Sequence, residues 1–253
     1  MMRVQKYLSQ AGICSRRKAE HYLKNGKISI NGQIVIRPGT LIDPDKDVVC
    51  LNNEKITNNN LNKIYIALNK PKGYVTSLKH TGHKLVIDLI DIQDRIYPIG
   101  RLDKESTGLI LLTNDGDLHN KLLHPSYDHE KEYEVIVHKT ITDKDLDQMK
   151  NGIDISGYIT RPAKIKRLSK KKFRIILQEG KNRQIRRMID TLGNKIINLK
   201  RIRIANIKLG NLAQGAWRYL NKNEIQFIKK NRKKSGDYYE CKSKLTKKCT
   251  SIF

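Results

Sequence analysis

Long apolar runs are missing from this chain of 253 residues. None approaches the roughly 20 residues that a membrane-spanning helix needs. The N-terminal stretch MMRVQKYLSQAG also lacks the apolar centre of a signal peptide. We therefore expect a cytoplasmic protein that has no membrane partner.

Cysteines are few, and no two of them form a C-x-x-C pair. Cys14, Cys50, Cys241 and Cys249 are scattered, which argues against a disulfide framework or a zinc knuckle and suits free thiols in a reducing compartment. Walker A and G-x-G-x-x-G sequences are absent as well. Chemistry driven by a bound nucleotide cofactor therefore has no support.

Acidic residues are scarce relative to basic ones. The chain has 25 Asp and Glu against 51 Lys and Arg, a formal net charge of +26. The excess gathers in three zones, with seven basic residues against one acid in 1–27, seventeen against two in 161–208 and ten against three in 221–253. This distribution predicts a polyanionic partner that is gripped at several points, either nucleic acid or an anionic membrane surface.

The first 60 residues are predicted to form a small module of a helix pair and a hairpin. The helices span 4–13 and 16–25, with Ser15 as N-cap of the second, and Asn31-Gly32 marks a tight hairpin turn. The segment RVQKYLSQAGICSRRKAEHYLKNGKISING resembles the S4 RNA-binding module. The basic side chains expected to contact RNA here are Arg3, Lys6, Arg16, Arg17, Lys18, Lys24 and Lys27.

The rest of the chain indicates an α+β domain. Strands are predicted at 64–70, 108–114, 131–137, 163–168, 173–178 and 195–204, and helices at 117–124, 142–152 and 182–193. Strands outnumber helices without alternating with them, which favours a mixed, largely antiparallel sheet with flanking helices over a doubly wound fold. We expect an S4 domain at 1–60, a polar linker at 57–63, a catalytic domain at 64–230 and a basic, disordered tail at 231–253.

The predicted helix at 182–193 has a clear apolar stripe, formed by Ile185, Met188, Ile189 and Leu192. At 100° per residue Arg186 lies at the edge of this stripe, whereas Arg183 and Arg187 point away from it. A charge at the edge of a core needs a partner. Arg186 is therefore the best candidate for an internal ion pair, and the other two are free for phosphate. The alternative is that all three form a solvated basic face.

The stretch GRLDKESTGLILLTNDG, residues 100–116, places a carboxylate just before an apolar strand. Asp103 lies at the mouth of that strand, in a loop whose Ser106, Thr107 and Gly108 can shape a pocket. An oriented carboxylate in an RNA-binding protein could act as a nucleophile, a base or a metal ligand. A plain turn residue is the alternative.

Metal chemistry and hydrolysis fit these residues poorly. His119, His124 and His129 recur every five residues, which suits neither a helix face nor a zinc motif. Asp103 and Glu105 lie two residues apart in one loop, whereas glycoside hydrolysis needs carboxylates on opposite sides of the bond. We expect no metal site.

Five segments together resemble the RsuA/RluB/RluE/RluF family of RNA pseudouridine synthases: NKPKG, GRLDKESTGLILLTNDGDL, KEYEV, EGKNRQIRRM and LKRIRI. They occur in the family's order, and the resemblance extends over residues 1 to about 228. It implies that Asp103 is the catalytic aspartate, Tyr133 the active-site tyrosine and Arg186 the arginine paired with the aspartate. Leu199 would line the uracil pocket, to which we also assign Arg101. The further residues assigned to RNA binding are Lys70, Lys72, Lys181, Arg183 and Arg187.

The resemblance implies isomerisation of uridine in structured RNA, without metal, cofactor or nucleotide. The target base must leave its stack to reach Asp103, which either adds covalently or takes a proton from the ribose. Within the family the chain looks most similar to the RluF type, which implies a hairpin in large-subunit (23S) rRNA and an anticodon loop of tRNA as second target. RluB-type and RsuA-type rRNA targets, a non-catalytic S4-type assembly factor and a hydrolytic glycosylase or nuclease are the alternatives. We expect a monomer.

Overall fold

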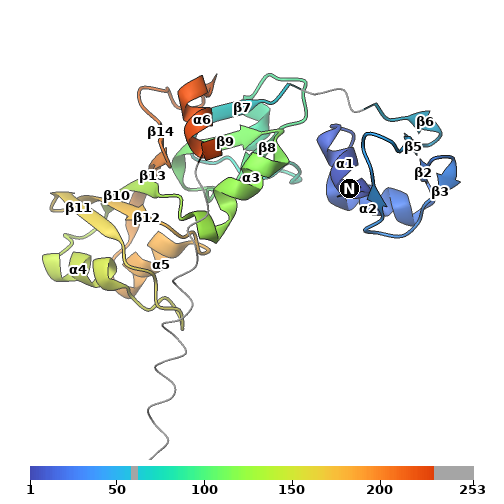
Figure 1. Ribbon diagram of the computed structural model, residues 1–253. Coiled ribbons are helices and arrows are strands. Elements are labelled where there is room, and N and C mark those ends of the chain that lie inside the picture. The colour runs from blue at the N-terminus through green and yellow to red at the C-terminus, as the bar shows by residue number, and fades with distance from the viewer. Residues whose placement is uncertain (58–61, 231–253) are drawn as a thin grey trace, which may run out of the picture.

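The computed structural model describes residues 1–57 and 62–230. Two modules follow one another along the chain (Figure 1). Part of the expected linker and the whole predicted tail, residues 58–61 and 231–253, lie outside the described residues. Within the described ranges, no helix is long and apolar enough to span a membrane.

The N-terminal module has the predicted helix pair and hairpin. Its elements are β1 (Met2–Arg3), α1 (Val4–Gln10), α2 (Arg16–Lys24), β2 (Ile28–Ile30), β3 (Gln33–Ile34), β4 (Leu41–Ile42), β5 (Val49–Leu51) and β6 (Glu54–Lys55). The Ser15 side chain caps α2 by accepting a hydrogen bond from the Lys18 backbone N–H at 3.1 Å. Asn31 and Gly32 adopt φ of 52° and 83°, the left-handed pair that a tight β2–β3 turn requires.

A mixed sheet of nine strands forms the second module. Its main path runs β11-β12-β10-β13-β9-β7-β15, with β8 paired to β9 and β14 to β13. The strands are β7 (Tyr65–Lys70), β8 (Tyr97–Ile99), β9 (Thr107–Thr113), β10 (Lys131–Val137), β11 (Lys164–Ser169), β12 (Lys172–Leu177), β13 (Ile196–Ile204), β14 (Ile207–Lys208) and β15 (Trp217–Tyr219). Only β9 and β13 are parallel among the described strand pairs of this sheet. The predicted α+β class is confirmed.

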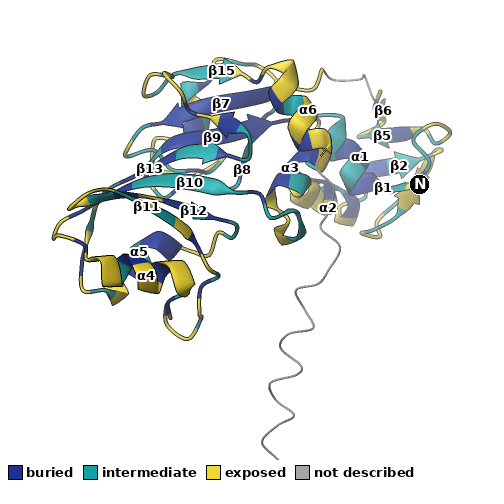
Figure 2. Ribbon diagram, turned by 60° about the vertical axis from the view of Figure 1, so that its left-hand side comes forward, coloured by how far each residue is buried: buried dark blue, intermediate teal, exposed yellow. Residues whose placement is uncertain are grey.

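Helices flank the two halves of this sheet (Figure 1). They are α3 (Gly116–Leu123), α4 (Asp143–Asn151), α5 (Gln184–Thr191) and α6 (Lys222–Lys230), with short 3-10 turns η1 (Val86–Leu89) and η2 (Pro125–Tyr127). Residues of α4 and α5 pack against β10, β12 and β13, and residues of α3 and α6 pack against β7 and β9. Figure 2 shows β7 and β9 buried and the outer surface of α4 exposed. The sheet is therefore built from two packed halves that meet at the β9–β13 pair.

A glycine makes the parallel junction possible. Gly108 begins the buried run of β9 and pairs with Arg201 of β13. It has φ of +99°, and a Cβ atom there would lie 2.2 Å from the Arg201 carbonyl oxygen. Only glycine tolerates both constraints. The loop that carries Asp103 therefore leads directly into the closest contact between the two halves of the sheet.

Candidate active site

A cleft of about 1090 Å³ opens where the two halves of the sheet meet. Its lining comes from the loop before β9, the end of α3 with η2, the start of β10, the β12–α5 connection and β13. Asp103, Tyr133, Arg186 and Leu199 all lie on this lining, together with Arg101. The chain thus brings five predicted site residues together from four separate segments.

Asp103 is held by two arginines from α5 and the residue before it, on the other side of the cleft. Arg186 Nε lies 3.3 Å from Asp103 Oδ2, and the Arg186 side chain is only 13% exposed. Arg186 Nη2 also donates to the Ser106 hydroxyl at 3.1 Å. The ion pair indicated by the helical wheel is therefore present, and it joins α5 to the loop before β9. Such a pair orients the carboxylate because its guanidinium is nearly immobile.

Arg183 also reaches the carboxylate, although the wheel had left it free for phosphate. Its Nη1 atom lies 3.8 Å from Asp103 Oδ2, and half of its side chain is exposed. The wheel argument failed because α5 begins only at Gln184, and Arg183 precedes it in a left-handed conformation with φ of 49°. Two guanidinium groups therefore face one carboxylate oxygen.

The Asp103 loop is fixed from beneath by a buried ammonium group. Lys70 Nζ donates to the carbonyl oxygens of Ser106 at 2.7 Å, Pro71 at 3.0 Å and Lys104 at 3.3 Å. Burial lowers the pKa of Lys70 to about 8, against the opposing attraction of Glu105 and Asp103. The assignment of Lys70 to RNA binding is therefore wrong, because this fully buried side chain cannot reach a phosphate.

Tyr133 and Leu199 lie on neighbouring strands of the cleft floor. The half-buried Tyr133 side chain packs against the apolar clusters of both halves. Leu199 is buried and pairs with Val135 across the β10–β13 ladder. The Arg201 guanidinium lies 6.0 Å from the centre of the Tyr133 ring. An aromatic ring, an aliphatic side chain and a carboxylate therefore share one enclosed space, as a flat base with a reacting ribose would require.

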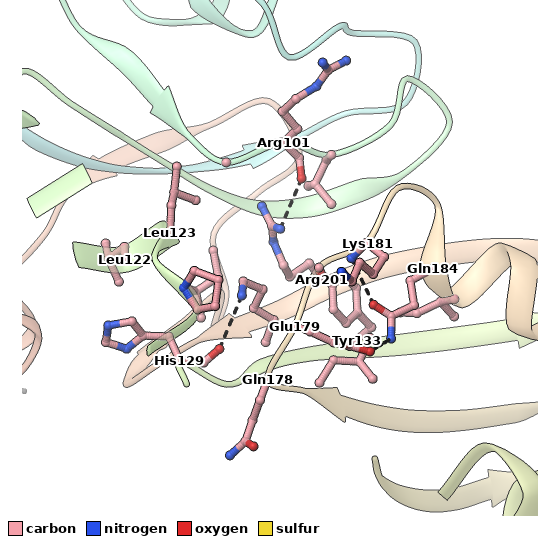
Figure 3. Close-up of a pocket in the computed structure, with 18 of the residues that line it drawn as sticks. Arg101, Leu122, Leu123, His129, Tyr133, Gln178, Glu179, Lys181, Gln184 and Arg201 are labelled. Atoms are coloured by element: carbon pink, nitrogen blue, oxygen red, sulfur yellow. Dashed lines mark hydrogen bonds between the residues drawn. The ribbon is translucent and has the colours of Figure 1, made fainter. Parts of the chain in front are cut away.

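A second group of polar side chains lines the outer part of the cleft. Glu179 accepts hydrogen bonds from Gln184 Nε2 at 2.6 Å and from the Tyr158 hydroxyl at 2.8 Å. Asp128 forms an ion pair with Arg161 at 2.9 Å. Figure 3 shows Glu179 and Gln184 joined on the side of Tyr133 and Lys181. The contacts of Glu179 hold the connection between β12 and α5 in place. Arg186 lies on α5, directly after this connection.

Three further residues that were assigned to RNA binding or to the substrate pocket make other contacts in the structure. The half-buried Arg187 guanidinium donates to the Ile155 carbonyl oxygen, and its phosphate contact stays a prediction for its other N–H groups. Lys6 of the N-terminal module forms an ion pair with Asp117 of α3 at 3.0 Å. Arg101 faces the cleft with its carbonyl oxygen, which accepts from Arg201 Nη1 at 3.4 Å, while its exposed side chain points away (Figure 3).

The remaining residues assigned to RNA binding are exposed, and their role stays a prediction. Lys72 carries one ion pair, with Glu105 at 3.4 Å. Lys181 lies over the Tyr158 ring at 4.3 Å from its centre, at the rim of the cleft. The other exposed members are Arg3, Arg16, Arg17, Lys18, Lys24 and Lys27. All of these ammonium and guanidinium groups are accessible to a polyanion.

Two cations of the cleft, the half-buried Lys131 and the buried Arg201, were missed by the sequence analysis. Lys131 and Arg201 both line the cleft, each two residues from a residue that had been assigned to the site. Because side chains alternate along a strand, Lys131 shares a face with Tyr133, and Arg201 with Leu199. Strand alternation was therefore the signal that could have found them.

No group of three or more metal-ligating side chains occurs within the described parts of the chain.

A basic helix-and-hairpin module next to a cleft in which two arginines face Asp103 fits an enzyme that acts on a nucleotide within RNA. Comparisons with known proteins agree. The S4 domain profile matches residues 2–48, and the RNA pseudouridylate synthase profile matches residues 64–191. The chain belongs to the RNA pseudouridine synthases, isomerases that convert uridine to pseudouridine within RNA.

Individual relatives span most of the chain. The dual-specificity RNA pseudouridine synthase RluF of Escherichia coli (strain K12) is 39% identical over 257 residues, covering 99% of this chain and 86% of the relative. The ribosomal large subunit pseudouridine synthase B of Bacillus subtilis (strain 168) is 40% identical over 238 residues, covering 90% and 96%. A crystal structure of a pseudouridylate synthase matches with a TM-score of 0.67 and 28% identity, over 90% of this chain and 100% of that one. The resemblance to the family is confirmed.

Proposed function

We propose that Asp103 is the catalytic residue and that its target is a uridine in a hairpin of large-subunit rRNA. The observation that carries the first part is the ion pair of Asp103 with Arg186 in the same cleft as Tyr133. Forming pseudouridine breaks a C–N glycosidic bond, turns the base and makes a C–C bond. Atoms and charges balance within the nucleotide, so the reaction needs an oriented carboxylate and no co-reactant.

The other cleft residues have separate roles in this proposal. Arg186 positions Asp103 against the nucleotide, because a guanidinium held on a helix restricts where the carboxylate can move. Tyr133 stacks on the uracil after the base leaves its helix, and Leu199 closes the apolar side of the pocket. The half-buried state of Tyr133 on the cleft lining supports this role, since part of its side chain stays accessible to a ligand.

The names of the relatives support the choice of RNA. One is called a dual-specificity RNA pseudouridine synthase and another a ribosomal large subunit synthase. Phosphate contacts give affinity without identifying a base. We infer that specificity comes from how a folded hairpin fits between the S4 module and the cleft. A tRNA anticodon loop is the second candidate target.

Mapping of pseudouridine in total RNA tests both parts. A strain that lacks this protein should lose pseudouridine at one large-subunit site, with or without a tRNA site. The wild-type protein should restore that site, and Asp103→Asn should not, because the amide keeps the shape and removes the anionic oxygen. Asp147→Asn is the matched control, since Asp147 lies on exposed α4 and pairs only with Lys150.

Each part can fail separately. Loss confined to small-subunit rRNA would reject the proposed target and indicate the RsuA type. Restoration by Asp103→Asn would reject the catalytic assignment. Released uracil or a cut chain in place of pseudouridine would indicate hydrolysis.

We further propose that the enzyme acts as a cytoplasmic monomer without a cofactor. All the groups assigned to the reaction come from one chain. Light scattering of the protein with and without RNA measures its mass. Activity of a dimer alone would contradict the proposal.

A further inference from the structure

The start of β10 presents a half-buried lysine side chain to the cleft. Lys131 lies two residues before Tyr133, so both side chains are on the same face of the strand. Within the described residues, its side chain has one hydrogen bond, a long contact of 3.4 Å to the carbonyl oxygen of His129. No carboxylate oxygen among the described residues lies within 4.0 Å of its Nζ atom. A half-buried charge in this position has lost water without gaining an ion pair.

The acidic side chains near Lys131 are held by other donors. Asp128 is paired with Arg161. Glu179 accepts from Gln184 and Tyr158, and also from the Arg161 backbone N–H at 3.0 Å. The neighbouring His129 imidazole is buried, which lowers its pKa and keeps it neutral. None of these side chains therefore forms an ion pair or a hydrogen bond with the Lys131 ammonium group.

A second cation lies behind the first. Arg201 is 3% exposed and donates to the carbonyl oxygens of Leu109 and Arg101, while its Nη2 atom is buried without a partner. Burial and the charge of Arg201 lower the pKa of Lys131 to about 8, and the attraction of Asp128 and Glu179 opposes this shift. Two cations thus face the cleft beside one aspartate that is already shared by two arginines.

We propose that Lys131 binds a backbone phosphate of the RNA next to the target uridine, with Arg201 reinforcing the positive field behind it. The inference rests on the proposed binding of that uridine beside Tyr133. Uracil is neutral, so the phosphates are the anionic groups of the ligand. A nucleotide that turns out of its stack carries its own phosphates toward the cleft. Lys131 is then a positioning residue that anchors the strand while Asp103 reacts.

Binding measurements with a labelled RNA hairpin that carries the mapped uridine test the proposal. Lys131→Met should raise the Kd by about tenfold or more. It should also reduce the slope of log Kd against log salt by about 0.7–0.9, the value for one phosphate contact. Lys131→Arg should restore most of the affinity. Lys164→Met, which removes an exposed lysine paired with Glu130, is the charge-matched control and should change neither quantity.

The pH dependence of RNA affinity distinguishes a phosphate contact from a purely structural role of Lys131. Wild-type affinity should fall as the pH rises through about 8, because Lys131 of the free protein then loses its proton. Lys131→Arg should lose the part of this fall that comes from residue 131, whereas any effect of Lys70, whose pKa is also about 8, is common to both proteins. The melting temperature of Lys131→Met should not fall, since the variant removes a charge whose burial is unfavourable. Identical pH profiles of wild type and Lys131→Arg would overturn the proposal.

A neutral linkage in the RNA identifies the atom that is bound. Replacing the phosphate beside the target by a methylphosphonate with 2′-O-methyl protection should weaken wild-type binding and leave Lys131→Met unaffected. Equal losses for both proteins at every linkage tested would overturn the assignment. The same preparations are assayed for pseudouridine. RNA that binds through Lys131 yet is never isomerised refutes the target proposed above and leaves this inference standing.

Discussion

The buried Lys70 gives the most informative perturbation, because one side chain holds the whole Asp103 loop. Replacement by methionine removes three hydrogen bonds from the ammonium group to backbone carbonyl oxygens. Leaving buried acceptors unsatisfied is unfavourable, whereas removing a buried charge is favourable and offsets part of the loss. We expect Lys70→Met to lower the free energy of unfolding by about 2–4 kcal/mol. Activity should fall as well, because the loop is no longer held in place.

The pH dependence of that difference tests its origin. The pKa of Lys70 is about 8 in the folded protein and 10.5 at its ordinary value, so the unfolded chain binds more protons between these limits. Protonation therefore disfavours the folded state, and the wild type gains stability relative to Lys70→Met as the pH rises from about 8. The difference between the two proteins should be roughly 2 kcal/mol larger at pH ~9.5 than at pH ~7.5, at about 1.4 kcal/mol per pH unit.

Urea unfolding measures this difference directly. Trp217 is the single tryptophan of the chain and lies on β15, beside the strand that carries Lys70, so its fluorescence reports on this sheet. The control is Lys72→Met, which removes an exposed lysine and should change stability by less than about 0.5 kcal/mol. Equal unfolding free energies for wild type and Lys70→Met, or a difference that shrinks with rising pH, would refute the reasoning.

Three further predictions concern the junction of the two sheet halves and α5. Gly108→Ala should destabilise the fold by about 3 kcal/mol or more, seen as loss of cooperative thermal unfolding, because its Cβ would collide with the Arg201 carbonyl group. Arg186→Ala should reduce the single-turnover rate by about 100-fold while RNA affinity stays within about twofold, since the carboxylate loses its orientation; an unchanged rate would contradict this. Arg187→Ala should lower the unfolding free energy by about 1–2 kcal/mol through loss of the bond to Ile155, and weakened RNA binding without destabilisation would show that the expected phosphate contact exists after all.

Local patterns in the sequence were sufficient for most of the secondary structure. Ser15 caps α2 as predicted, and α4 lies within the predicted helix 142–152, with a capping box of Thr142 and Asp145 at its start. The turn at Asn31-Gly32 follows from two residues that tolerate positive φ. The apolar stripe of α5 is buried, because helical periodicity alone decides which face can leave water.

The need of Arg186 for an anionic partner also followed from local information, and the resemblance to the family then indicated Asp103 as that partner. An arginine at the edge of an apolar stripe needs an anion, and Asp103 preceded an equally apolar strand. Family motifs then assigned Tyr133 and Leu199 to the same cleft, and both line it.

The environment of long basic side chains was decided only by the tertiary structure. Lys70 and Lys72 are two residues apart, yet one is fully buried beneath the Asp103 loop and the other is exposed. The difference arises because the carbonyl acceptors of Lys70 at Lys104 and Ser106 lie more than 30 residues further along the chain. Likewise Lys131 and Arg201 become unpaired cations of the cleft because β10 and β13 pair at one particular register. A sequence determines which residues carry charge, but loop closure and strand register determine which charges lose their water.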